Sequence, residues 1–217
     1  MSNWTPRTTR NGLEYGGEAH PYYWDPAYNP NASYANCLAN CTTYAYGRIL
    51  EAHQPKPVQS IVNAGGWHNY VNQEEGWTAI PFSSHEDKIK PGDILEWNGH
   101  VAVVEEVING MPYLSSSDYT GDHGQAYWPP GSSNFDRRTV AVMGPSVQSV
   151  SNWMFANYPS RVFSYYSLEQ LCNRMGSVPT YVLVNPATTP QDDSLPVWML
   201  ILLSKKRKKR LGGIRYL

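Results

Sequence analysis

The sequence places a cysteine at the start of a helical pattern, where it could act as a nucleophile. Residues 36–48 read N-C-L-A-N-C-T-T-Y-A-Y-G-R, and Ala45 and Ile49 follow at the spacing of one helix face. Asn40 is a typical N-cap residue, so we expect Cys41 in the first turn of this helix. There the positive end of the helix dipole would lower the pKa of the thiol and favour the nucleophilic thiolate.

A histidine stands at the start of a predicted strand further along the chain. Residues 90–107 read K-P-G-D-I-L-E-W-N-G-H-V-A-V-V-E-E-V, and the Asn98-Gly99 pair is a strong hairpin signal. His100 would therefore open the returning strand, where its side chain can face a cleft. A cysteine that opens a helix and a histidine that opens a strand are typical of cysteine hydrolases, in which the histidine takes the thiol proton.

These stretches together resemble the CHAP family, the cysteine, histidine-dependent amidohydrolases/peptidases that cleave peptidoglycan in phage lysins and bacterial autolysins. The resemblance rests on the run around Cys41, on N-A-G-G-W at 63–67, on P-G-D-I-L-E-W at 91–97 and on G-H-V-A-V-V-E-E-V at 99–107. The motifs follow the family's order and cover roughly residues 30–145. The resemblance implies that Cys41 is the nucleophile and His100 the base.

The fold that the resemblance implies is α+β and papain-like, with N-terminal helices that carry the nucleophile packed on an antiparallel β-sheet. We expect an irregular arm at 1–33, the catalytic domain at 34–145, a packed extension at 146–185, and a linker with an apolar and basic tail at 186–217. The periodicity predicts helices at 40–53, 63–73 and 167–174, and strands at 93–97, 100–107, 113–119, 139–143 and 180–184.

The group that orients the histidine departs from the family pattern. CHAP domains usually place Glu, Asn or Asp on the strand after the histidine strand, but here that strand reads Y-L-S-S-S-D-Y-T-G. Ser116 occupies the slot usually held by Glu or Asn, and Asp118 lies two residues further on the same face. We favour Asp118, because a carboxylate also stabilises the imidazolium. Orientation by the Ser116 hydroxyl or by a water, or a weak site, are the alternatives.

Two neighbouring glutamates and a second histidine are expected to lie outside the site. Glu105 and Glu106 come too far along the strand to reach His100, so we expect them to be exposed at its end. His68 lies in a polar context and is expected to be solvated.

The remaining site residues are interpreted from their place around the cysteine. The backbone N–H of Cys41, with Asn40 nearby, would hold the oxyanion. No metal or other cofactor is required. Aromatic side chains that could stack on glycan or peptide are Trp97, Tyr119, Tyr127 and Trp128.

Composition and charge limit the class of protein. The chain has 217 residues, of which 41% are hydrophobic, and a net charge of −1, which describes one globular domain. No run reaches the roughly eighteen apolar residues of a membrane span. The first residues lack the apolar core of a signal peptide, so we expect the host cytoplasm before lysis, or a phage virion, as the location.

The C-terminal tail concentrates positive charge. Residues 204–217 contain seven basic side chains and no acidic one: Lys205, Lys206, Arg207, Lys208, Lys209, Arg210 and Arg215. The apolar run 195–203 precedes them. This layout favours contact with a phage structural protein or an anionic surface over specific nucleic-acid recognition.

The cysteines beyond the nucleophile have no assigned state. Cys37 and Cys172 could form a disulfide or remain reduced.

The preferred function is cleavage of a peptidoglycan amide, either as an N-acetylmuramoyl-L-alanine amidase or as a peptide endopeptidase, by a phage-encoded enzyme. The alternative is a catalytically inactive structural or wall-binding component of a phage particle. A cysteine protease of ordinary proteins is a weaker third possibility.

Overall fold

A six-stranded antiparallel sheet forms the centre of the protein. The computed structural model describes residues 4–11, 13–15, 18–29, 40–60, 63–117, 146–157 and 162–187. The strand order is β3-β8-β4-β5-β6-β7. The strands are β3 (Thr78–Pro81), β4 (Ile94–Trp97), β5 (His100–Ile108), β6 (Met111–Ser116), β7 (Ser164–Ser167) and β8 (Tyr181–Val184). A separate small sheet pairs β1 (Glu14–Tyr15) with β2 (Glu18–Ala19).

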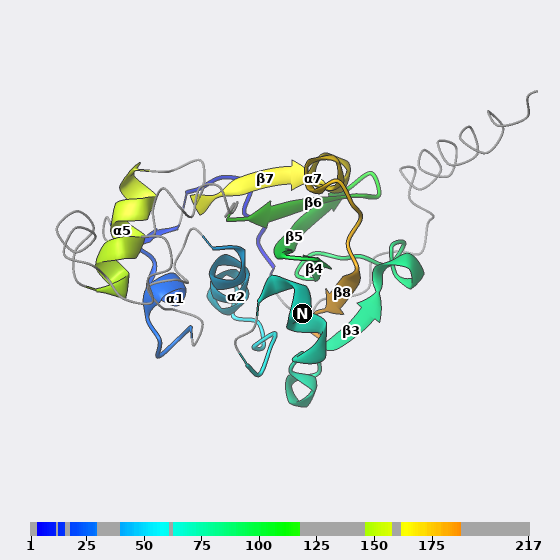
Figure 1. Cartoon of the computed structure of the whole chain (residues 1–217), viewed down its shortest axis with the longest axis horizontal. Coiled ribbons are helices and arrows are strands. Elements are labelled where there is room, and N and C mark those ends of the chain that lie inside the picture. The colour runs from blue at the N-terminus through cyan, green and yellow to red at the C-terminus, as the bar shows by residue number, and fades with distance from the viewer. Residues whose placement is uncertain are drawn as a thin grey trace, which may run out of the picture.

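Helices lie on both faces of the large sheet. They are α1 (Pro21–Trp24), α2 (Cys41–Glu51), α5 (Val147–Asn157) and α7 (Leu168–Met175), with 3₁₀ helices η1 (Ala64–Asn69), η2 (Gln73–Glu75) and η3 (Phe82–Ser84). Figure 1 shows α5, α1 and α2 in succession beside the sheet, and α7 at the end of β7. The described part of the chain contains no helix that is long and apolar enough to cross a membrane. This is the α+β architecture that the sequence predicted.

The β4–β5 hairpin forms as predicted. Trp97 pairs with His100 across a two-residue turn, and Gly99 adopts φ 92°, a left-handed conformation that glycine tolerates. The turn fixes His100 as the first residue of β5. The sequence signal was strong because the turn residues and the flanking strands agree with each other.

Helix α2 packs on one face of the sheet. Its N-cap is Asn40, whose side chain accepts a hydrogen bond from the backbone N–H of Thr42 at 2.9 Å, so the predicted cap is confirmed. The buried side of α2, including Ala45 and Ile49, packs into one cluster with Val101 of β5. Cys41, the first residue of α2, belongs to the same cluster. Since Val101 is the second residue of β5, this packing places the start of α2 beside the start of that strand.

Gly47 allows α1 to approach the other side of α2. A Cβ atom built on Gly47 would lie 2.6 Å from Tyr23 Cδ1 and 2.7 Å from the carbonyl oxygen of Tyr22. Any larger residue would push α1 away. The glycine in the Y-G-R sequence therefore has a packing role.

Helix α7 covers the opposite face. Ser167 caps it with a complete capping box, because the Ser167 hydroxyl accepts from Gln170 N–H and the Gln170 side chain accepts from Ser167 N–H. Leu168 and Leu171 pack there with Leu114 of β6. The predicted helix at 167–174 and strand at 180–184 are both confirmed.

The C-terminal segment supplies two strands of the large sheet rather than covering it from outside. Strand β7 pairs with β6, and β8 lies between β3 and β4. The strand predicted at 139–143 lies outside the described residues. The helix predicted at 63–73 is instead the two 3₁₀ helices η1 and η2, since Gly65 and Gly66 weaken an α-helix.

The prediction that Glu105 is exposed is wrong. The pairing of β5 with β6 shifts between Val104 and Glu106, and the bulge leaves Glu105 without a partner across the strands. Its side chain is wholly buried against α2, where it forms an ion pair with Arg48. Glu106 is half-buried and accepts a hydrogen bond from the Tyr165 hydroxyl.

Candidate active site

Cys41 is the first residue of α2 and lies against the start of β5. The backbone N–H groups of Val101, Thr42 and Cys41 itself lie near its thiol and favour the thiolate. Val101 directly follows His100 in the chain. The sulfur therefore sits where the sequence predicted it, next to the first residues of the histidine strand.

The electrostatic expectation for Cys41 is wrong. The residue is only 5% exposed, and burial raises the pKa of its thiol to about 11 although the three N–H donors favour the thiolate. The loss of hydration outweighs the donors because a thiolate has far more to lose from desolvation than a neutral thiol. At neutral pH the sulfur carries its proton.

His100 is equally buried, with 4% of its surface exposed. Burial, with a smaller contribution from the positive charge of Arg174 on α7, lowers the pKa of His100 to about 4. The imidazole is therefore neutral at pH 7. Its ring lies 6.1 Å from the ring of Trp97, centroid to centroid.

The two residues lie at adjoining element ends, because Cys41 packs with Val101, the residue that follows His100. Among the described residues, the hydrogen bonds include none between Cys41 Sγ and the His100 ring. Strand alternation directs His100 to the side of Ala102, whereas Cys41 packs with Val101. Catalytic hydrogen bonds are often long or misaligned in free enzymes and tighten with substrate. The groups available are thus a neutral thiol at the start of α2 and a neutral imidazole at the start of β5, so proton transfer would have to accompany attack by the sulfur.

A hydroxyl group contacts the histidine. Ser116 Oγ lies 3.2 Å from His100 Nε2 and is 2% exposed. Ser116 Oγ also lies 3.1 Å from the hydroxyl of Ser164, on β7. Asp118, the favoured orienting residue, lies outside the described residues. No sequence signal marked Ser164, since no strand was predicted at 164–167.

Trp97 does not form a substrate-facing wall. It is wholly buried in the cluster beneath α7, and its indole N–H donates to the carbonyl oxygen of Ser177. This corrects the prediction of substrate binding, because alternation along β4 directs Trp97 into the core. Tyr119, Tyr127 and Trp128 lie outside the described residues.

Asn40 and the N–H of Cys41 occupy the positions proposed for an oxyanion site. The side-chain oxygen of Asn40 accepts from the Thr42 backbone N–H and, at 2.5 Å, from the Thr42 hydroxyl. These two bonds fix the carboxamide at the start of α2. The backbone N–H of Cys41 lies beside its own sulfur and favours the thiolate.

A second imidazole, His68, is held on the same face of the sheet as Cys41. The Glu96 carboxylate, wholly buried on β4, lies 2.9 Å from His68 Nδ1 and accepts from the His68 backbone N–H at 2.8 Å. The His68 ring stacks on Tyr181 at 4.0 Å. His68 is thus half-buried and paired, not solvated, and the pair fastens η1 to the sheet.

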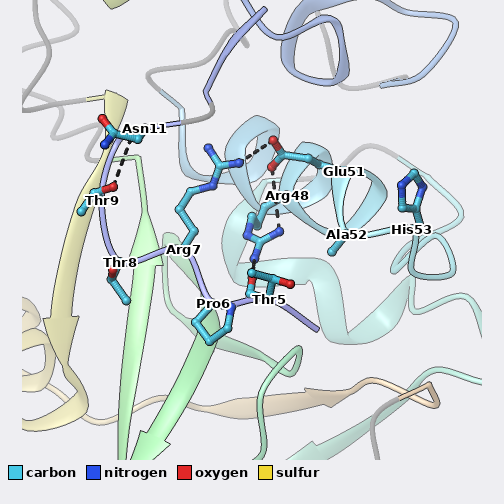
Figure 2. A pocket seen from close by; sticks show the side chains of 10 residues that line it. All are labelled: Thr5, Pro6, Arg7, Thr8, Thr9, Asn11, Arg48, Glu51, Ala52 and His53. Carbon is cyan, nitrogen blue, oxygen red and sulfur yellow. Dashed lines mark hydrogen bonds and ion pairs between the residues drawn. The ribbon is translucent and has the colours of Figure 1, made fainter. Parts of the chain in front are cut away.

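A hydrophilic cavity lies away from Cys41 and His100. A cavity of about 380 Å³ is lined by residues 5–9 and by the C-terminal end of α2, including Arg48 and Glu51 (Figure 2). Cys41 is at the opposite end of that 11-residue helix, about 16 Å long. The cavity belongs to the contact between the N-terminal segment and α2.

The thiols and acids of the described residues show no metal site. No three His, Cys, Asp or Glu side chains gather there as metal ligands would. Cys172 on α7 is a free, half-buried thiol, and Cys37 lies outside the described residues.

Comparison with known families supports the resemblance seen in the sequence. Residues 29–119 match the model of the CHAP domain. No curated protein and no solved structure gives a significant match to the chain. The matched region contains Cys41, His100 and Ser116, and its helix-on-antiparallel-sheet arrangement is the α+β, papain-like fold. Strands β7 and β8 come from beyond that region.

Proposed function

We propose that this chain is a peptidoglycan hydrolase that cleaves an amide bond with Cys41 as nucleophile and His100 as base. The observation that carries the proposal lies inside the CHAP match. The cysteine that opens α2 packs with Val101, the residue that follows the histidine that opens β5. A nucleophile and a base at adjoining element ends are the minimum that acyl transfer through sulfur requires.

The reaction follows from the protonation states of the two side chains. Cys41 Sγ attacks the carbonyl carbon while His100 takes the thiol proton. The C–N bond then breaks, the amine leaves with that proton, and the acyl group remains on sulfur as a thioester. Water, deprotonated by His100, attacks the thioester, and the proton returns to Sγ. His100 must turn toward Sγ, or act through a water, for the first step.

The start of α2 would stabilise the negative charge that develops on the carbonyl oxygen during attack. We assign the oxyanion to the backbone N–H of Cys41, with the fixed carboxamide of Asn40 beside it. One well-placed donor of this kind contributes on the order of 3 kcal/mol to stabilising the transition state. The match to the CHAP domain supports either an N-acetylmuramoyl-L-alanine amidase or an endopeptidase of the stem or cross-bridge peptide.

The biological setting that we propose is a phage lysin or a virion-borne enzyme that acts at the bacterial cell wall. Its support is the resemblance to lysin domains. The tail at 186–217 would add a contact with an anionic surface or a phage structural protein, through the basic side chains of 204–217.

Mass spectrometry of digested peptidoglycan tests the function. Purified walls are incubated with wild type, with Cys41→Ala and with Cys172→Ala, which removes a free thiol on α7, on the other face of the sheet. We expect new muropeptides from wild type and Cys172→Ala alone, and their masses and end groups identify the bond. Equal products from Cys41→Ala would refute the mechanism.

One observation favours the inactive alternative. The thiol is buried with a raised pKa, and its bonds are to backbone groups, as in a structural cysteine. Such a protein would sediment with walls without releasing products. Walls from several hosts that remain intact while they bind the wild-type protein would establish this alternative.

A further inference from the structure

We propose that Ser164 positions His100 through Ser116, in a relay of hydroxyl groups that fixes which ring nitrogen carries the proton. The relay begins at Ser116, in the slot where the resemblance led us to expect an amide or a carboxylate. Its catalytic consequence rests on the proposed function, but the relay itself can be measured without any substrate.

The three residues come from three adjacent strands. His100 is on β5, Ser116 on β6 and Ser164 on β7, which are neighbours in the sheet. His100 Nε2 lies 3.2 Å from Ser116 Oγ, which lies 3.1 Å from Ser164 Oγ, and the Ser164 hydroxyl donates to the backbone carbonyl of Ser116 at 3.0 Å. Their exposed fractions are 4%, 2% and 8%. The chain of contacts is therefore shielded from bulk water.

The direction of each bond follows from counting protons. A backbone carbonyl can only accept, so the single hydroxyl proton of Ser164 lies on its bond to that carbonyl. The contact between the two hydroxyls must then use the proton of Ser116. No hydroxyl proton remains for the contact with the ring, so Nε2–H must be its donor. This assignment is the one that gives each of the three contacts its own proton.

The consequence is a defined tautomer. With Nε2 protonated, Nδ1 carries the lone pair and is the nitrogen able to take a proton. The relay needs no rearrangement when His100 becomes charged, because Nε2–H donates to Ser116 in both states. Unlike a carboxylate, it brings no negative charge, which fits an imidazole that burial keeps neutral.

The neighbouring serines of the same segment have other partners. The Ser115 hydroxyl donates to Glu105 on the α2 face. The Ser117 hydroxyl donates to the carbonyl of Val162 at 2.6 Å. Ser117 is wholly buried and tied to the same C-terminal segment as Ser164, so Ser117→Ala is a matched control for the loss of a buried hydroxyl.

The experiment measures the tautomer by nitrogen NMR of protein with ¹⁵N-labelled histidine, with His100 assigned by the signal lost in His100→Gln. Wild type, Ser164→Thr, Ser164→Val and Ser117→Ala are compared at pH 7. Thr and Val have nearly the same shape, but only Thr keeps the hydroxyl. We expect the Nε2–H form in wild type, Ser164→Thr and Ser117→Ala. In Ser164→Val the proton of Ser116 becomes available to the ring, so the Nδ1–H form should gain a substantial population.

Kinetics on peptidoglycan then separate positioning from structure. We expect kcat to fall about tenfold in Ser164→Val, with KM within about twofold of wild type, and both constants to be retained in Ser164→Thr. An Nδ1–H ring in wild type, an unchanged tautomer in Ser164→Val, or equal shifts in both variants would overturn the relay. If Ser164→Val fails to fold, Ser116→Ala provides the same NMR test, because it removes the acceptor of Nε2–H. An inactive wild type would defeat the proposed function while the NMR result still decides the relay.

Discussion

The pairing of Arg48 with Glu105 gives the sharpest quantitative prediction for stability. The guanidinium of Arg48 donates from Nε and Nη2 to the two oxygens of the Glu105 carboxylate, each at 2.9 Å. The Glu105 side chain is wholly buried, and that of Arg48 is 5% exposed. Burial alone would lower the pKa of Arg48, but the hydrogen bonds and the charge of Glu105 raise it above its ordinary value. The pair fastens α2 to β5, the two elements that carry Cys41 and His100.

Replacement of Arg48 by Met should destabilise the protein by about 4 kcal/mol. Removal of one partner of a buried pair leaves the other as an uncompensated charge, which costs about 3–5 kcal/mol. Arg48 also lies 4.4 Å over the ring of Trp4, a contact worth about 1 kcal/mol, and donates to the carbonyl of Thr5. Two other donors to Glu105, the Ser115 hydroxyl and the Arg7 backbone N–H, lessen the loss.

A double-mutant cycle in urea at pH 7, followed by tryptophan fluorescence, measures the pair. It compares wild type, Arg48→Met, Glu105→Gln and the double variant, with Lys56→Met as the control for loss of an exposed cation. The double variant should be more stable than the sum of the single changes by about 2 kcal/mol or more, because neither buried charge remains. The control should stay within about 0.5 kcal/mol of wild type. A loss under about 1 kcal/mol in Arg48→Met, or strict additivity, would refute the reasoning.

Three further predictions follow from the buried acids and bases and from the sheet order. Since the pKa of His100 is lowered to about 4 and that of Cys41 is raised to about 11, kcat/KM should stay flat through neutral pH and fall below about pH 4. A pH–rate profile on soluble muropeptide measures this, and a fall in rate with a midpoint near pH 6.5 would contradict it. Burial raises the pKa of Asp93 to about 7, above the usual unfolded value of about 3.9. The stability that the protonated carboxyl contributes is therefore fully present below about pH 4 and is lost as pH rises through 7, on the order of 4 kcal/mol in the unfolding free energy. Asp93→Asn should flatten this dependence of the unfolding free energy on pH in denaturation curves at pH 4 to 8. Truncation to residues 1–145 removes β8 from between β3 and β4, so circular dichroism should show no cooperative unfolding, whereas residues 1–187 should unfold cooperatively.

Local sequence signals predicted the elements that carry Cys41 and His100. The cap at Asn40 and the Asn98-Gly99 turn each fix the backbone through residues within a few positions of one another. Both signals also agree with the apolar spacing of the segments that follow. That agreement explains why the places of Cys41 and His100 could be predicted without a structure.

Contacts between distant parts of the chain explain the errors. The exposure of Glu105 was predicted from its place near a strand end, but Arg48 of α2, a residue 57 positions away in the chain, covers and pairs with its carboxylate. Ser164 meets Ser116 only because β7 pairs with β6, a pairing that local spacing does not indicate. Trp97 was predicted to stack on substrate, whereas it is wholly buried in the cluster beneath α7.

The raised pKa of Cys41 shows the same conflict between local and long-range effects, and it bears on mechanism. The helix start and three N–H donors favour a thiolate, and a local reading stops there. Burial of Cys41 opposes them and keeps its thiol neutral, and burial likewise keeps His100 neutral. A carboxylate beside His100 would favour the imidazolium and hence a charged pair, whereas the hydroxyls of Ser116 and Ser164 orient the ring without adding charge. The proposed relay and the burial thus act in the same direction, because both favour an oriented, uncharged imidazole. In the proposed mechanism, charges would form only when a carbonyl accepts the sulfur.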